Sequence, residues 1–184
     1  MEEYDAFRSG VEFGGLVNTT EIRALICYML TKLDPISGET LRTVFQEHGF
    51  ANYFDVSEAI SELIRMGNIS AEYTDEGEER LVLTQSGQNV AWELSPLVPK
   101  TVREKALSAG LAAISRQKNA KENDVQIVPN GSGFNVVICV GAPNDALMRL
   151  TVYAADMAQA TRMKDNYLKD PVKIYSEILA SLIL

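Results

Sequence analysis

The pattern of hydrophobic and polar positions predicts a helix in the middle of the N-terminal half, and the neighbouring elements are arranged around it. Asp55 is a suitable N-cap residue, with Glu58 three positions later as in a capping box. Gly67 and Asn68 suit the left-handed turn that ends a helix. Apolar residues recur at helical spacing between these ends and predict the buried side of the helix: Val56, Ala59, Ile60, Leu63, Ile64 and Met66.

A hairpin is predicted directly after this helix, and two helices before it. Strand-forming residues occupy 69–73 and 80–84, and turn-forming residues separate the two runs. Upstream, Asn18 predicts the cap of a first helix, which ends at Pro35 because proline cannot continue the hydrogen-bond ladder. Ser37 predicts the start of a second, shorter helix. Three helices followed by a hairpin are typical of a winged helix-turn-helix.

Two further helices are predicted between the hairpin and the C-terminal half. Thr84 caps the first, to which Trp92 adds apolar contacts, and Pro96 ends it. The second runs from about Lys100 to Arg116 and has apolar residues on two nearly opposite sides. A helix with two apolar sides is usually packed on both, so it either joins the two halves or lies against a second copy of the chain. The polar residues 117–122 then predict a break between the halves.

The C-terminal half is expected to form a small antiparallel sheet. Apolar and polar residues alternate in the later two of three strand-like runs, 125–128, 134–140 and 146–153, as in strands with one covered face. The sequence Asn130-Gly131-Ser132-Gly133 predicts a hairpin turn between the first two strands.

Two helices follow the predicted strands and complete the fold. One lies near residues 155–164, and the last starts at Asp170-Pro171 with a broad apolar face that should cover the sheet. We therefore expect an α+β protein with an N-terminal winged helix-turn-helix, a bridging helix and a C-terminal three-stranded antiparallel sheet covered by helices. The expected segments are a winged helix-turn-helix domain with an N-terminal arm at 1–98, the bridging helix and linker at 99–121, and the sheet with its helices at 122–184.

Charge is divided unevenly between the two halves of the chain. The 184 residues have a net charge of −8. Residues 1–98 contain six cations and seventeen acidic residues, a balance of −11, whereas residues 99–184 contain eleven cations and eight acidic residues, a balance of +3. The winged-helix half therefore has few cations with which to neutralise phosphates, the main source of non-specific affinity for DNA.

Residue types that perform catalysis or bind metals are scarce. His48 is the only histidine, and Cys27 and Cys139 each lie in an apolar run as small core residues. These three residues are too few and too separated for a catalytic triad or a zinc site, so we expect no enzyme, no cofactor and no metal. No apolar run approaches the roughly 20 residues that a membrane helix needs. With no signal-peptide pattern at the N-terminus either, we expect a cytoplasmic protein.

The exposed side of the third predicted helix carries the candidate DNA contacts. In a helix-turn-helix this side enters the major groove, where Arg65 would pair with guanine and Ser57 and Ser61 would reach bases or phosphates. Arg80 in the hairpin is a fourth candidate. Glutamates share both surfaces and would repel a polyanion. Three interpretations therefore stay open: a solvated acidic face, a groove-reading face, and a face that contacts protein.

A second set of candidate contacts follows the winged helix-turn-helix domain and consists of Lys100, Arg103 and Lys105. They would contact the phosphate backbone beside the wing, or dock against the acidic half of a second subunit. The alternative is that they are ordinary solubilising charges.

Three short motifs resemble those of a known family. They are Asn52-Tyr53-Phe54-Asp55 before the third helix, Leu83-Thr84-Gln85-Ser86-Gly87 after the hairpin, and the stretch 98–105. Their order and spacing resemble an uncharacterised bacterial domain-of-unknown-function family with a winged-helix-like N-terminal half. The resemblance implies a winged-helix fold and a role in transcriptional regulation, but no activity, ligand or catalytic residue.

Two functions of different classes are therefore expected. The first is a winged-helix transcriptional regulator that binds duplex DNA as a homodimer, with the C-terminal half used for dimerisation or sensing. The alternative is an acidic winged-helix module that binds a protein partner and does not bind DNA.

Overall fold

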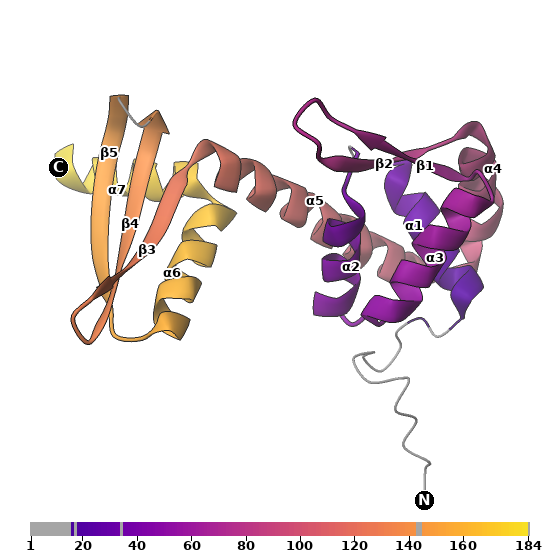
Figure 1. Cartoon of the computed structure of the whole chain (residues 1–184), viewed down its shortest axis with the longest axis horizontal. Helices are drawn as coiled ribbons and strands as arrows, with labels where there is room; N and C mark the ends of the chain where they lie inside the picture. The colour runs from indigo at the N-terminus through magenta and orange to yellow at the C-terminus, as the bar shows by residue number, and fades with distance from the viewer. Residues whose placement is uncertain (1–15, 17, 34, 143–144, 184) are drawn as a thin grey trace, which may run out of the picture. The chain divides into compact units, whose positions relative to one another are not determined.

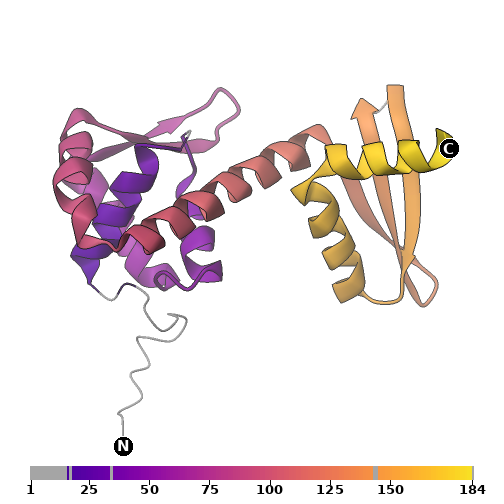
Figure 2. The same ribbon diagram turned by 180° about the vertical axis from the view of Figure 1, so that it is seen from behind.

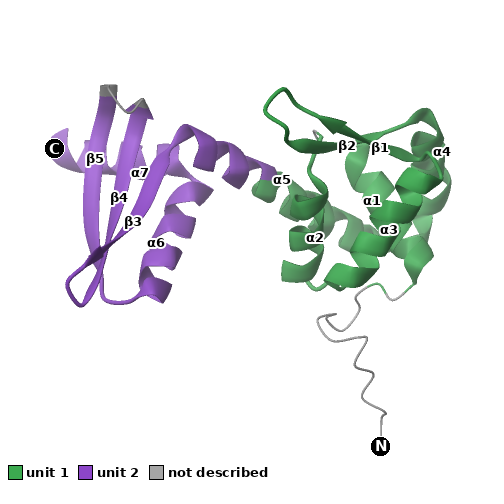
Figure 3. Ribbon diagram, viewed as in Figure 1, with its two compact units in different colours: residues 1–113 green, residues 114–184 purple. Residues whose placement is uncertain are grey.

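The computed structural model describes residues 16, 18–33, 35–142 and 145–183. The chain forms two compact units, residues 1–113 and 114–184, and the boundary between them falls inside one long helix (Figure 3). The N-terminal arm expected before the first helix lies outside the described residues, apart from Leu16.

Unit 1 has the element order of a winged helix (Figure 1). Ile36 forms an isolated antiparallel β-bridge with the hairpin, in which Leu81 donates its backbone N–H to the carbonyl of Ile36, 2.9 Å away. This bridge ties the segment between the first two helices to the wing. The elements are α1 (Thr19–Leu30), α2 (Gly38–Glu47), α3 (Tyr53–Arg65), β1 (Ile69–Tyr73), β2 (Glu79–Leu83), α4 (Gln85–Leu94), the short η2 (Ser95–Leu97) and α5 (Lys100–Glu122).

The core of unit 1 is built around α1, which is apolar on almost every side. Seven of its twelve residues are buried, so α1 is covered by neighbouring elements rather than being amphipathic. Helices α3 and α4 pack against it, α2 packs against α3, and the hairpin adds Leu81. The largest fully buried side chains of this core are Phe45, Ile22, Leu25, Ile26, Met29, Ile36, Leu41, Leu63, Ile69 and Leu81.

The start of α3 differs from the predicted one. Asn52, not Asp55, is the N-cap: its Oδ1 accepts the backbone N–H of Asp55 at 2.9 Å. Asp55 lies in the first helical turn, where its carboxylate accepts from Asn52 Nδ2 at 2.7 Å. Asparagine and aspartate are equally good cap residues, so the sequence did not separate the two. The other predicted caps are confirmed at Asn18, Ser37 and Thr84.

Several apolar residues predicted to be buried are exposed instead. Ile64 and Met66 at the end of α3 are 40% and 51% exposed. Trp92 does not pack α4 against the core but is 85% exposed. In each case smaller or better-placed neighbours fill the core, with Leu63 buried in α3 and Ala91 in α4. These three large side chains are consequently available on the surface.

Unit 2 is a three-stranded antiparallel sheet with helices on one face (Figures 1 and 2). Its core contains Val136 and Ile138 from the central strand and Ala160, Tyr167 and Leu168 from α6. The prediction of a polar break at 117–122 is wrong, because α5 continues as a helix to Glu122. The elements are the end of α5, β3 (Asp124–Asn130), β4 (Gly133–Ala142), β5 (Asp145–Ala154), α6 (Met157–Lys169) and α7 (Pro171–Ile183).

The second face of the sheet is open and largely polar. Arg149 donates from Nε to the Sγ of Cys139 on the neighbouring strand, 3.3 Å away. At the hairpin end, Tyr153 lies so close to Gly133 that a Cβ at this glycine would overlap the tyrosine hydroxyl and the carbonyl of Ala154. Gly131 has a φ of +60° in the two-residue turn, which explains the glycine there.

Helix α7 covers the sheet only in part, although its whole apolar face was expected to do so. Figure 2 shows α7 crossing the strands at one end of the sheet. Ile174 packs against the sheet core, whereas Val172, Leu182 and Ile183 are 74%, 77% and 81% exposed. The helix therefore has one apolar side inside the unit and one facing solvent. With this qualification, the α+β fold expected from the sequence is confirmed.

Candidate nucleic-acid interface

The solvent side of α3 carries a row of polar residues at helical spacing. Ser57, Ser61 and Arg65 are four residues apart and so lie along one line of the helix surface. The Oγ of Ser57 donates to the carbonyl of Tyr53 at 2.8 Å, and that of Ser61 to the carbonyl of Ser57 at 2.9 Å. Both hydroxyl oxygens keep acceptor capacity. The side chain of Arg65 is 73% exposed.

Arg42 of α2 lies beside this row, a residue that the sequence reasoning missed. Its Nε donates to the Oγ of Ser57 at 3.0 Å, and its guanidinium carbon lies 5.7 Å from the ring centre of Tyr53. Its Nη1 is 3.4 Å from the carboxylate of Glu39 in the preceding turn. Arg42 and Ser57 are fifteen residues apart and belong to different helices. No local pattern could have revealed this cation at the start of the row.

A three-residue charge cluster occupies the other half of α3. Glu62 accepts from Arg23 of α1 at 2.8 Å and lies 3.8 Å from Arg65. The side chains of Arg23 and Glu62 are only 22% and 28% exposed, so water screens this pair less than a fully exposed one. Both arginines are thus held by a single carboxylate on the surface that would face DNA.

A carboxylate also occupies the N-terminus of α2. The backbone N–H of Gly38 donates to Glu79 Oε2 of the wing strand at 3.0 Å. Free N–H groups and the helix dipole make such a terminus favourable for anions. In DNA complexes of helix-turn-helix proteins the helix before the recognition helix crosses the phosphate backbone, so Glu79 occupies a position suited to a phosphate.

The wing tip is acidic and tightly turned. Gly77 has a φ of +81°, and its N–H donates to the carbonyl of Thr74 at 2.8 Å. Asp75, Glu76 and Glu78 are exposed around it. Arg80 lies in β2 opposite Glu72 of β1. The hairpin therefore presents one exposed cation, and that cation is directly across from a carboxylate.

The three cations of α5 that were candidates for phosphate contact have different surroundings. Lys100 is exposed and lies 3.6 Å from Glu104 one turn later. Arg103 is half-buried, with its guanidinium carbon 5.1 Å from the ring centre of Tyr28. The Nζ of Lys105 lies 5.4 Å from the ring centre of Phe50, a residue of the turn between α2 and α3. Lys105 is thus nearest to the helix-turn-helix, and Arg103 contributes mainly to packing.

A protein-family model described as a domain of unknown function, DUF4364, matches residues 22–182. The chain belongs to the DUF4364 family. The match starts in α1 and ends in α7, so it includes elements of both units. This confirms the family resemblance seen in the motifs of the N-terminal half. No curated protein and no solved structure matched the chain.

In the DUF4364 chain, burial and hydrogen bonding shift the pKa values of Cys27 and Arg149. Burial raises the pKa of the Cys27 thiol to about 12, against a smaller opposing effect of Arg23. The hydrogen bond to Cys139 is the main cause that raises the pKa of Arg149. Among the described residues, no three or more His, Cys, Asp or Glu side chains group as a possible metal site. Within the same part of the chain, no helix has the length and apolarity required to span a membrane.

Proposed function

We propose that this DUF4364 protein is a transcriptional regulator that binds duplex DNA as a dimer, with α3 in the major groove. The proposal is supported chiefly by the row of Ser57, Ser61 and Arg65 on the solvent side of α3 in a winged-helix scaffold. Scaffolds of this kind often bind DNA, although a fold alone does not fix a function. The proposal gains weight from Arg42, which hydrogen-bonds to the first residue of the row. Serine and arginine are residues that reach base edges and phosphates.

Binding must compete with the carboxylates that already hold the arginines. Arg23 and Arg65 both contact Glu62, and Arg42 contacts Glu39. A phosphate can replace an exposed carboxylate partner, since exposed ion pairs contribute only about 0–1 kcal/mol each. We therefore expect moderate affinity that depends steeply on salt, because each neutralised phosphate releases about 0.9 counterions.

A dimer would supply a second α3 and a second set of cations. The exposed side of α7 supports this assembly: Val172, Tyr175, Leu179 and Leu182 follow the three-four-three spacing of a coiled-coil seam. The only ion pair described in α7, Lys173 with Glu177 at 3.9 Å, lies away from this seam. An uncharged stripe of this spacing matches a second helix of the same kind, so we assign a second copy of α7 as its partner.

The DNA-binding proposal is tested with labelled fragments of the source genome in a gel-shift or anisotropy titration. We expect complexes at low salt. The logarithm of the affinity should fall linearly with the logarithm of the salt concentration. Arg65→Ala should reduce the preference for its base by about 1–3 kcal/mol. Absence of any complex at low salt with the dimeric protein would refute the proposal.

The dimer is tested separately by light scattering. Leu182→Asp introduces a charge into the seam and should give a monomer, whereas Ser181→Asp, one residue away on the other side of α7, should leave the dimer intact. A wild-type protein that stays monomeric at high concentration would remove this part of the proposal.

A second candidate function is the acidic interaction module. It is favoured by the −11 balance of residues 1–98 and by the acidic wing. Phe54 and Tyr73, which are 80% and 70% exposed at the start of α3 and at the end of β1, would then serve as aromatic contacts to a protein. Failure to bind DNA, combined with an intact fold, is the result that favours this function.

A further inference from the structure

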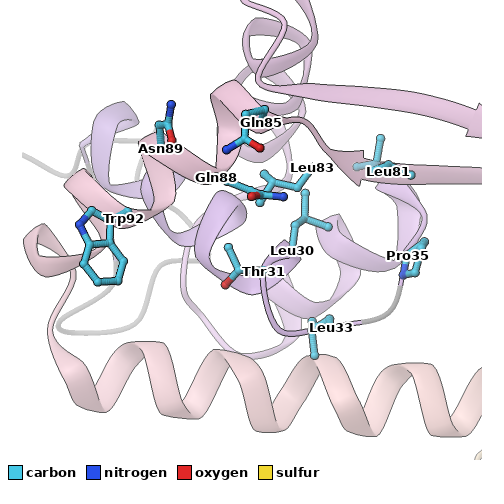
Figure 4. Close-up of a pocket in the computed structure, with 11 residues that line it drawn as sticks. Leu30, Thr31, Leu33, Pro35, Leu81, Leu83, Gln85, Gln88, Asn89 and Trp92 are labelled. Carbon is cyan, nitrogen blue, oxygen red and sulfur yellow. The ribbon is translucent and has the colours of Figure 1, made fainter.

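A cavity of about 640 Å³ lies on unit 1 between the end of α1, strand β2 and helix α4 (Figure 4). Its volume is in the range typical of sites for small organic molecules. Leucines from α1 and β2 form its apolar part, and amide side chains of α4 lie along one side (Figure 4). The residues that line it are Leu30, Thr31, Leu33, Pro35, Leu81, Val82, Leu83, Gln85, Gln88, Asn89 and Trp92.

None of the described residues that line the cavity has an ionisable side chain. This is notable in a half of the chain with a balance of −11. A charged ligand would lose hydration without gaining a counter-ion, which is unfavourable. Gln85, Gln88 and Asn89 instead offer amide donors and acceptors. The cavity therefore matches an uncharged molecule with one or two hydrogen-bonding groups.

Trp92 gives the cavity its aromatic wall. A single exposed hydrophobic residue needs no explanation in itself, but this indole is 85% exposed and belongs to the cavity lining. Figure 4 shows Trp92 at one end of the group, on the same helix as Gln85, Gln88 and Asn89. A flat aromatic ligand would cover the indole by stacking, an arrangement worth about 0.5–1.5 kcal/mol beyond the area buried.

We propose that this cavity binds a small, flat, uncharged aromatic molecule, which stacks on Trp92 and hydrogen-bonds to the amides of α4. Because β2 forms both the cavity wall and one strand of the wing, an occupant would contact the base of the wing. Regulation of DNA binding by this ligand depends on the proposed function above. Binding itself does not.

The test uses the natural chain, in which Trp92 is the only tryptophan. N-phenyl-1-naphthylamine, an uncharged aromatic amine that accepts energy from tryptophan, is titrated into the protein. We expect saturable quenching of Trp92 with a matching rise in probe emission. The anionic relative 8-anilinonaphthalene-1-sulfonate adds only a sulfonate group. We expect it to bind at least about tenfold more weakly, because no described residue of the lining supplies a cation to pair with the sulfonate.

Two matched variants locate the site. Gln88→Glu places a carboxylate in the lining and should weaken binding of N-phenyl-1-naphthylamine several-fold. Gln46→Glu makes the same change at an exposed position of α2 outside the lining and should have no effect. The proposal is overturned by non-saturable quenching, by equal affinity for the two probes, or by equal affinities of the two variants. None of these results bears on whether the protein binds DNA.

Discussion

Replacing Glu62 by glutamine should strengthen DNA binding, although it removes a stabilising ion pair. Glu62 holds Arg23 at 2.8 Å and lies 3.8 Å from Arg65. Glutamine keeps the size of the side chain and loses the charge. Both guanidinium groups then become available to DNA, Arg23 to a phosphate and Arg65 to the base that it is proposed to read. The change thereby tests whether the arginines paired with Glu62 can bind DNA once their carboxylate partner is removed.

The expected magnitudes follow from these contacts. Loss of the part-buried Arg23–Glu62 pair should lower the free energy of unfolding by about 1 kcal/mol. The two released arginines, each gaining about 0.5 kcal/mol from its contact with DNA, should raise DNA affinity about fivefold. The slope of log affinity against log salt should become steeper by about 0.9, for the one phosphate contact that Arg23 adds.

The matched control is Glu58→Gln on the same exposed side of α3. Glu58 is exposed and its change removes the same charge, so it should raise affinity by about twofold through weaker repulsion alone, with an unchanged salt slope. Affinities are measured by anisotropy between about 50 and 200 mM salt, and unfolding by urea. Equal salt slopes for the two variants would show that the released Arg23 does not reach a phosphate, and this prediction would be refuted.

Three further predictions concern stability and reactivity. Gly87→Ala should lower the free energy of unfolding of unit 1 by more than about 2 kcal/mol, since its Cβ would overlap the carbonyl of Asn68. Gly77→Ala at the open wing tip should lower it by only about 1 kcal/mol. Both are measured by urea unfolding. Cys27 should resist alkylation at pH 8 until the protein unfolds. Its pKa of about 12 in the folded protein exceeds the ordinary 9.0. The stability that the neutral thiol contributes is therefore complete below pH 9 and is lost as the pH rises towards 12. Glu79→Gln should lower the free energy of unfolding by about 0.5 kcal/mol through the weaker cap on Gly38, and unchanged unfolding would contradict that role.

Much of the fold follows from the sequence because caps, glycines and periodicity act locally. Asn18, Ser37 and Thr84 cap helices as their positions predicted. Gly67, with a φ of +71°, ends α3 as expected. Where two good signals compete the local rules do not decide, as for the start of α3. Periodicity also does not reveal which of several apolar residues reaches the core, as the exposed Trp92 shows.

The surroundings of the candidate site were less predictable than the site residues themselves. Helical spacing placed Ser57, Ser61 and Arg65 on one side of α3, and they do lie there. Contacts that surround these residues come from elsewhere in the sequence. Arg42, which donates to Ser57, is fifteen residues from it, Arg23 is thirty-nine residues from Glu62, and Glu79 is forty-one from Gly38. Such contacts are set by the packing of whole elements, which no local pattern contains.

The close fit of Tyr153 over Gly133 has a consequence for variation within the DUF4364 family. A side chain at position 133 would collide with the tyrosine hydroxyl and with the backbone carbonyl of Ala154. A shorter residue at 153 removes only the first of these overlaps. Relatives should therefore keep glycine at position 133 whatever residue they carry at position 153.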